Sequence, residues 1–167
     1  MTVPFRERLI FDASGGTLHD EARRYMMIRP AALMGIFRRL PTDARTEALA
    51  ALQASIFEQG SDSAQAYVAH AGTAEGLMTI IPATAADLGW GRWNLTRAGE
   101  SLLLEVADSP FADGYGPSEG PICHAITGML QGVAGILTGR PARAREIECA
   151  AMGAAQCRFH TDPEGQA

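Results

Sequence analysis

The stretch from Cys123 to Cys157 reads CHAITGMLQGVAGILTGRPARAREIECAAMGAAQC and contains all three cysteines of the 167-residue chain. Cys149 lies 26 residues after Cys123 and 8 before Cys157, and Glu146 precedes Cys149 by 3. Thiolates and carboxylates are ligands that zinc accepts, and four such groups complete one tetrahedral site. The stretch therefore predicts a metal site, although it lacks the C-x-x-C pairs of the tightest zinc motifs.

The same stretch predicts a helix followed by two strands. Residues 122–137 show helical periodicity, whereas residues 143–150 (RAREIECA) and 157–162 (CRFHTD) are typical of strands. Three glycines lie along the predicted helix, at Gly128, Gly132 and Gly135. Each lowers helix propensity by about 1 kcal/mol relative to alanine. A helix that keeps them is expected to need close approach by another backbone or by a ligand.

This map has consequences for the four proposed ligands. Cys123 falls in the first helical turn, where the helix dipole favours a thiolate. Residues three apart on a strand face opposite sides, so a bulge or the strand end must separate Glu146 from Cys149 if both reach one metal. His124 is a rival ligand, but the helical period turns it about 100° away from Cys123, so we prefer Glu146. Three thiolates and a carboxylate leave no open position, which favours a structural zinc over a catalytic one.

The preceding segments add a hairpin and an aromatic loop. Residues 91–98 and 101–107 are predicted to be two antiparallel strands joined around Gly99. Residues 108–121 contain three glycines and three prolines, so we expect a loop. It carries Phe111 and Tyr115, either as a lid over an apolar site or as rings that anchor a surface connection.

The first half of the chain is predicted to be extended at first and then helical. Residues 5–28 alternate and contain the turn ASGG, which indicates a hairpin-like segment. Four helices are then expected, over residues 30–40, 43–60, 61–70 and 73–90, the last one kinked or divided at Pro82. Pro30, Ser61 and Thr73 mark helix starts, and Gly60 marks an end.

Composition indicates one α+β domain over residues 1–167, in which helices of the N-terminal half pack on an antiparallel sheet. We expect an extended segment at 1–29 and a frayed tail at 162–167. With 47% hydrophobic and 20% charged residues, the chain can bury a substantial core. It has no run of 18 apolar residues and no signal peptide, which predicts a cytoplasmic, non-membrane protein. Three cysteines there argue against disulfides, and the net charge of -5 argues against direct nucleic-acid binding.

Two motifs resemble the 4-vinyl reductase-like domain family, also described as a hydrocarbon-binding domain. They are GMLQGVAGILTGRP at residues 128–141 and EIECAAMGAAQCRF at residues 146–159, with a looser match in RYMMIRPAALMGIF at residues 24–37. The family includes a bacteriochlorophyll-pathway protein and the sensor domains of phenol- and xylene-responsive activators. The resemblance implies a fold related to Golgi transport-particle subunits and haem nitric-oxide sensors, commonly dimeric, with an apolar ligand cavity near a zinc.

The resemblance also implies site residues. In the phenol sensors zinc is held by a cysteine, a glutamate and two cysteines, which match Cys123, Glu146, Cys149 and Cys157 here. Those sensors grip the phenol hydroxyl with a histidine and a tryptophan. The candidates for ligand binding in this chain are His70, Trp90, Trp93, Phe111 and Tyr115.

We therefore expect a zinc-stabilised domain, forming a homodimer, that senses or carries a hydrophobic or aromatic ligand. A tetrapyrrole biosynthesis protein of the 4-vinyl reductase type is an alternative, and an assembly scaffold is a second. The sequence shows no nucleophile elbow, P-loop or dinucleotide fingerprint, so it offers no catalytic residues and argues against an enzyme.

Overall fold

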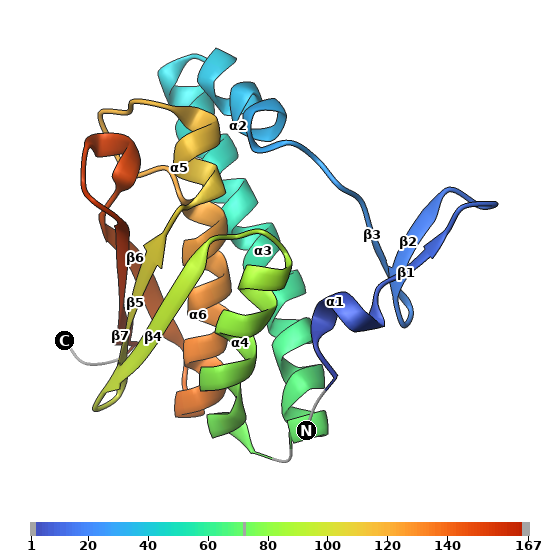
Figure 1. The fold of residues 1–167 in the computed structure, drawn as a ribbon. Helices are drawn as coiled ribbons and strands as arrows, with labels where there is room; N and C mark the ends of the chain where they lie inside the picture. The colour runs from blue at the N-terminus through green and yellow to red at the C-terminus, as the bar shows by residue number, and fades with distance from the viewer. Residues whose placement is uncertain (1–2, 72, 165–167) are drawn as a thin grey trace.

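The computed structural model describes residues 3–71 and 73–164, except for the side chains of residues 70 and 71. A four-stranded antiparallel sheet and the helices on one of its faces form the body, and a small three-stranded sheet projects from it (Figure 1). This combination confirms the predicted α+β class. Among the described residues, no helix is long and apolar enough to cross a membrane.

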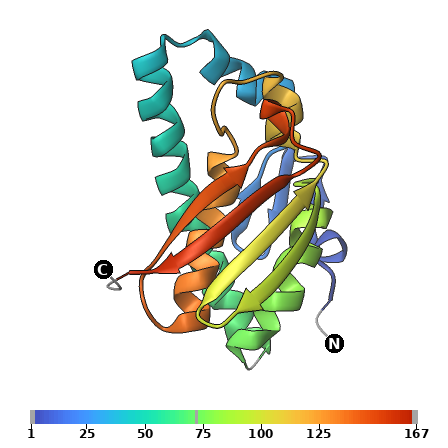
Figure 2. The same cartoon turned by 90° about the vertical axis from the view of Figure 1, so that its left-hand side faces the viewer.

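The large sheet has the strand order β4-β5-β7-β6. Its strands are β4 (Arg92–Ala98), β5 (Ser101–Ala107), β6 (Ala142–Glu148) and β7 (Cys157–Pro163). The β4–β5 hairpin turns at Gly99, as predicted, with φ of 63°. In β5, Leu102, Leu104 and Val106 are buried and the residues between them are partly exposed. The helices cover the face to which these three point, and the other face is uncovered (Figure 2).

Two layers of helices lie behind the sheet. The helix α6 (His124–Thr138) packs on the sheet, α4 (Leu77–Asp87) lies beside it against β4, and α3 (Thr42–Ala71) packs on α6 (Figure 1). Buried apolar residues of α6, such as Ile126, Leu130 and Val133, join Phe159 of β7 in the core between sheet and helices. The site described below lies where α6 begins and β6 ends.

The helix α3 corrects one prediction, because the two helices expected at 43–60 and 61–70 are one continuous helix. Ser61 does not cap a new helix: its hydroxyl donates to the carbonyl of Phe57, 2.6 Å away. Gly60 does not end one either. It lies against Met129 of α6, where a Cβ on residue 60 would come within 2.9 Å of the methionine side chain. Close packing between the helices thus explains the glycine.

A second correction concerns residues 108–121, which were expected to form a loop. They include a six-residue helix, α5 (Pro110–Tyr115), in which Phe111 and Tyr115 are buried. Ser109 caps it by accepting a hydrogen bond from the amide of Ala112, and Gly116 ends it with φ of 81°. These are regular start and stop residues of a helix, and the abundance of glycine and proline concealed them.

The N-terminal segment forms an arm that is only partly as predicted. It begins with a short helix, α1 (Phe5–Arg8), followed by the antiparallel strands β1 (Ile10–Asp12), β2 (Thr17–Asp20) and β3 (Arg23–Tyr25). An extended stretch, residues 26–29, leads to α2 (Pro30–Arg39), which starts at Pro30 as expected (Figure 1). The buried carboxylate of Asp20 accepts two hydrogen bonds from Arg8, which also approaches Tyr67 of α3 and so ties the arm to the body.

The remaining elements are short. The 3-10 helix η1 (Ala74–Gly76) is capped by Thr73, as predicted, and leads directly into α4, which contains Pro82 without a break. A second 3-10 helix, η2 (Ala150–Met152), joins β6 to β7. The tail expected from residue 162 differs, because β7 continues to Pro163 and the amide of Glu164 donates to the carbonyl of Pro141.

Candidate metal site and aromatic cluster

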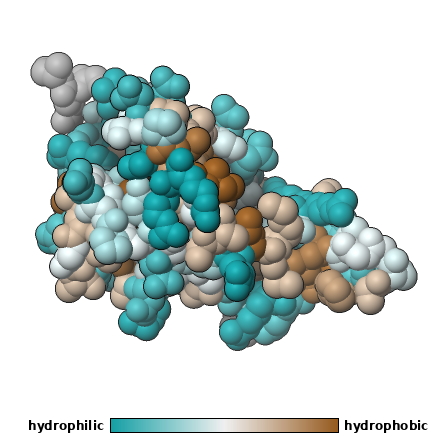
Figure 3. All heavy atoms as spheres, turned by 90° about the horizontal axis from the view of Figure 1, so that it is seen from above, coloured by the Kyte–Doolittle hydropathy of each residue, from teal (hydrophilic) through white to brown (hydrophobic). Residues whose placement is uncertain are grey.

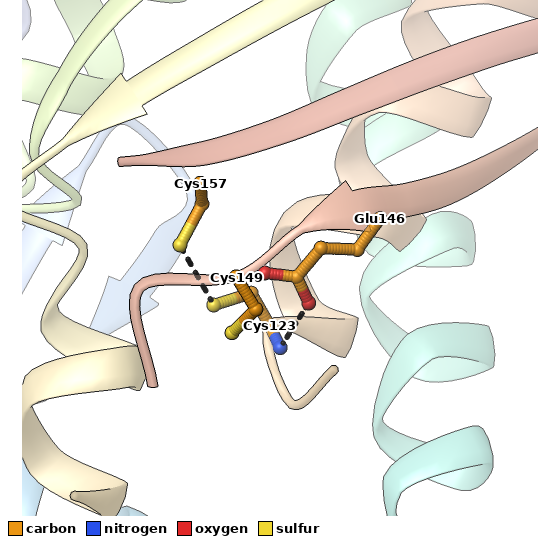
Figure 4. Close-up of side chains that lie close together, drawn as sticks. All are labelled: Cys123, Glu146, Cys149 and Cys157. Atoms are coloured by element: carbon orange, nitrogen blue, oxygen red, sulfur yellow. Dashed lines mark hydrogen bonds between the residues drawn. The ribbon is translucent and has the colours of Figure 1, made fainter. Parts of the chain in front are cut away.

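Cys123, Glu146, Cys149 and Cys157 come together, with their ligand atoms all within 4.8 Å of one another (Figure 4). Cys123 precedes the first residue of α6, Glu146 lies near the end of β6, Cys149 follows that strand and Cys157 begins β7. The three cysteines are buried and free. This arrangement of donors could hold a metal ion.

A β-bulge brings Glu146 and Cys149 to the same side. Glu146 pairs with Phe159 and Glu148 with Arg158, so Ile147 is an extra residue in the ladder. Ile147 is 46% exposed, whereas Cys149, just beyond the strand, is 1% exposed. Both devices anticipated from the three-residue spacing, a bulge and a strand end, are therefore present.

The contacts within the cluster fit a cation. The Sγ atoms of Cys123 and Cys157 are 3.6 Å apart, close to the edge of about 3.8 Å expected for a tetrahedron with zinc–sulfur bonds of about 2.3 Å. Oε2 of Glu146 accepts a hydrogen bond of 2.9 Å from the Cys123 amide. Its Oε1 is buried without a hydrogen-bond partner among the described residues. A metal ion would satisfy this oxygen, since native structures rarely leave a buried acceptor unpaired.

The electrostatics of the cluster point the same way. Burial raises the pKa of Glu146 to about 8. The pKa of Cys149 is lowered because the thiols of Cys123 and Cys157 donate hydrogen bonds to its sulfur, and the pKa of Cys123 is raised by the same sharing. The four groups thus retain protons that a divalent cation would replace.

His124, the rival ligand, is not part of this cluster. Its Nδ1 lies 3.1 Å from Oε1 of Gln53 on α3, and the Gln53 amide in turn faces Gln131. Burial lowers the pKa of His124, which favours the neutral imidazole. The histidine therefore joins α6 to α3.

Three of the predicted ligand-binding residues contact one another, and we call Trp90, Trp93 and Phe111 the aromatic cluster. The rings of Trp90 and Phe111 meet edge to face with centroids 5.1 Å apart, and those of Trp90 and Trp93 are 6.4 Å apart. Trp93 Nε1 donates to the carbonyl of Trp90. Tyr115, at the other end of α5, is also buried. The side chain of His70 lies outside the described part of the chain.

Two hollows in the described surface lie elsewhere. One, of about 270 Å³, is lined by Gln53, Phe57 and Gln131 with two alanines of α3. The other, of about 230 Å³, lies where the arm meets α3, around Arg8, Asp20 and Tyr67. Neither includes a member of the aromatic cluster, in which Trp93 is 9% and Phe111 6% exposed. A ligand at the cluster would have to displace these side chains, and its assignment stays a prediction.

Sequence reasoning missed Ser109. Its Oγ lies 3.4 Å from Sγ of Cys123, and the residue is buried. The signal that could have found it is the Ser109-Pro110 pair, which marks a helix start directly before Phe111.

Residues 102–163 match the model of the 4-vinyl reductase domain family, which confirms the resemblance drawn from the motifs in this region. The comparison with curated protein sequences found no match.

Three solved structures share the fold. The phenol-responsive sensory domain of the transcription activator PoxR, solved with phenol, has a TM-score of 0.80 and 22% identity, covering 96% of this chain and 87% of that domain. A vinyl-4-reductase family protein from Methanocaldococcus jannaschii has a TM-score of 0.52 and 13% identity, covering 83% and 97%. A trafficking protein particle complex subunit 3 from Naegleria fowleri, covalently bound to palmitic acid, has a TM-score of 0.52 and 13% identity, covering 81% and 95%. These likenesses confirm the expected relation to transport-particle subunits at the level of fold.

Proposed function

Since residues 102–163 match the 4-vinyl reductase domain family, we propose that this chain is a zinc-stabilised domain that binds a small aromatic or other hydrophobic molecule, as a sensor or carrier. The observation that carries the proposal is the aromatic cluster beside a four-donor metal site. Two structures of the same fold hold apolar ligands, phenol in the PoxR domain and palmitic acid in the trafficking subunit, and this supports the ligand class.

We assign zinc to Cys123, Glu146, Cys149 and Cys157. Zinc suits three sulfurs and one carboxylate oxygen in a closed tetrahedral site, where it stabilises the fold and offers no position for a substrate. The cluster joins the start of α6 to β6 and β7, so the bound ion would hold the helical layer to the sheet.

Ligand binding is assigned to Trp90, Trp93, Phe111 and Tyr115. Aromatic faces and edges bind a planar apolar molecule through burial and edge-to-face contact, each pair contributing about 0.5–1.5 kcal/mol beyond burial. Phe111 belongs to α5, which has only six residues, and we propose that this helix moves to admit the ligand.

The test is a titration of phenol, and separately of a porphyrin, into the zinc-loaded protein while tryptophan emission is recorded. Both tryptophans of the chain belong to the aromatic cluster, so occupancy should change their emission. Phe111→Ala should weaken binding about tenfold or more, and Phe57→Ala, in the hollow on α3, should not. A porphyrin response without a phenol response favours the tetrapyrrole alternative. Loss of binding in Phe57→Ala alone would move the site to the hollow, and no response to either ligand contradicts the proposal.

We further propose that the protein acts as a homodimer in the cytoplasm. Large exposed apolar side chains gather on the arm and on the stretch that follows it, namely Ile10, Phe11, Met26, Met27 and Ile28. In Figure 3 apolar surface continues from the body onto the arm. Apolar patches of this kind mark interaction sites, and a second copy of the chain is the partner we propose. Three free cysteines suit a reducing compartment.

A further inference from the structure

We propose that Ser109 is a positioning residue that couples the metal site to the aromatic cluster through α5. The inference rests on the proposed metal site and goes beyond it, because it makes the position of an aromatic side chain depend on the metal.

Ser109 contacts both sides of this coupling. Its Oγ lies 3.4 Å from Sγ of Cys123, and it accepts the hydrogen bond from the amide of Ala112 that caps α5. A hydroxyl can accept with a lone pair while it donates its only proton. The sulfur of Cys123 bound to a cation has no proton and can only accept. The hydroxyl would then donate to the sulfur, in a charge-assisted bond that is stronger than one between neutral groups.

The helix α5 depends on such contacts because six residues are too few for a stable helix in isolation. Its capping residue, Ser109, contacts Cys123 at one end. Beyond the other end, the amide of Ser118 donates to the carbonyl of Ala151, in the η2 segment between Cys149 and Cys157. Both flanks of α5 are therefore tied to chain segments that carry ligands of the proposed metal.

The aromatic cluster receives this constraint through Phe111, the second residue of α5. The ring of Phe111 packs edge to face on Trp90 at 5.1 Å, so a shift of α5 changes the environment of that indole. Binding of the metal should fix the helix and, with it, the apolar site. The coupling is reciprocal, so a molecule that fits the cluster should strengthen metal binding by the same factor.

The experiment is a zinc titration of the metal-free full chain, read in two ways. Competition with a chromophoric chelator gives the zinc affinity, and tryptophan emission reports on the aromatic cluster, since zinc itself is spectroscopically silent. Ser109→Ala removes the hydroxyl, and Ser109→Thr keeps it. Thr73→Ala is the matched control, because it removes the same kind of cap from η1, where Thr73 accepts from the amide of Gly76.

Zinc should change the emission of the wild-type chain. Ser109→Ala should lose about tenfold in zinc affinity, a typical effect of removing a group that supports a metal ligand, and most of the emission change at saturating zinc. Ser109→Thr and Thr73→Ala should retain both. Saturation of the wild type without an emission change overturns the coupling and leaves the metal site intact, whatever the behaviour of Ser109→Ala. An unchanged response in Ser109→Ala overturns it too, and failure of the wild type to bind zinc refutes the metal site together with the coupling.

Discussion

Sγ of Cys123 and Sγ of Cys157 lie 3.6 Å apart although 34 residues separate the two cysteines. The first residue precedes α6 and the second begins β7, so the contact joins the helical layer to the sheet. Four acidic groups gathered in a buried space repel one another once ionised, and a cation relieves that repulsion. The same groups should therefore determine both metal content and stability.

We expect one zinc per chain, lost in Glu146→Gln and kept in Glu148→Gln. Glu146 faces the three cysteines, whereas Glu148, two residues along the same strand, pairs with Arg158 on the surface. Removal of zinc should lower the free energy of unfolding by about 3 kcal/mol or more, the linkage expected at a hundredfold excess over Kd. Elemental analysis and urea unfolding measure the two quantities. A zinc-free wild type, or equal zinc content in the two variants, would contradict the assignment.

The metal cluster could be predicted from the sequence because its constraint is local. A three-residue spacing on a strand requires a bulge or a strand end, and the ladder shows the bulge at Ile147. The hairpin at Gly99 was predictable for the same reason, since alternation and turn residues are short-range signals.

The boundaries of α3 and α5 could not be predicted from such signals. Gly60 and Ser61 resemble a helix end and a helix start, yet Gly60 is retained because Met129 packs against it, a contact across 69 residues. Conversely, α5 is stabilised by its contacts and escapes notice among glycines and prolines. The packing that decides both cases lies outside any local window.

Gly128→Ala should destabilise the protein by about 1–3 kcal/mol or more, as overpacking of a core does. A Cβ at Gly128 would lie 2.3 Å from the carbonyl oxygen of Gln53, because the backbones of α6 and α3 meet there. Gly135→Ala on the same helix is the control. Its nearest neighbour would be the Arg140 carbonyl at 3.6 Å, so alanine should be neutral or stabilise by up to about 1 kcal/mol. Chemical unfolding compares the two, and equal effects would show that the close approach is not decisive.

His124→Gln should make stability less sensitive to acid. Burial lowers the pKa of His124 in the folded state, so below the ordinary histidine pKa the unfolded chain binds more protons than the folded one. The stability that the neutral imidazole provides is present above about pH 6.5 and is lost as the pH falls below it, by at most about 1.4 kcal/mol per pH unit. Urea unfolding between about pH 5 and 7 measures this slope. His160→Gln, on the sheet, should keep the wild-type slope, and an unchanged slope in His124→Gln would refute the attribution.

The double variant Met26→Asp with Met27→Asp should convert a dimer into monomers. These side chains are 81% and 87% exposed in the single chain, and flexible methionines adapt well to a partner surface. Charges there would have to be desolvated in an interface, whereas in the monomer they cost little, about 0.5 kcal/mol or less. Sedimentation velocity measures the association. Phe57→Asp puts the same charge on a partly exposed apolar residue of α3 and should leave the dimer intact. A monomeric wild type, or dissociation by Phe57→Asp alone, would place the contact elsewhere than on the arm.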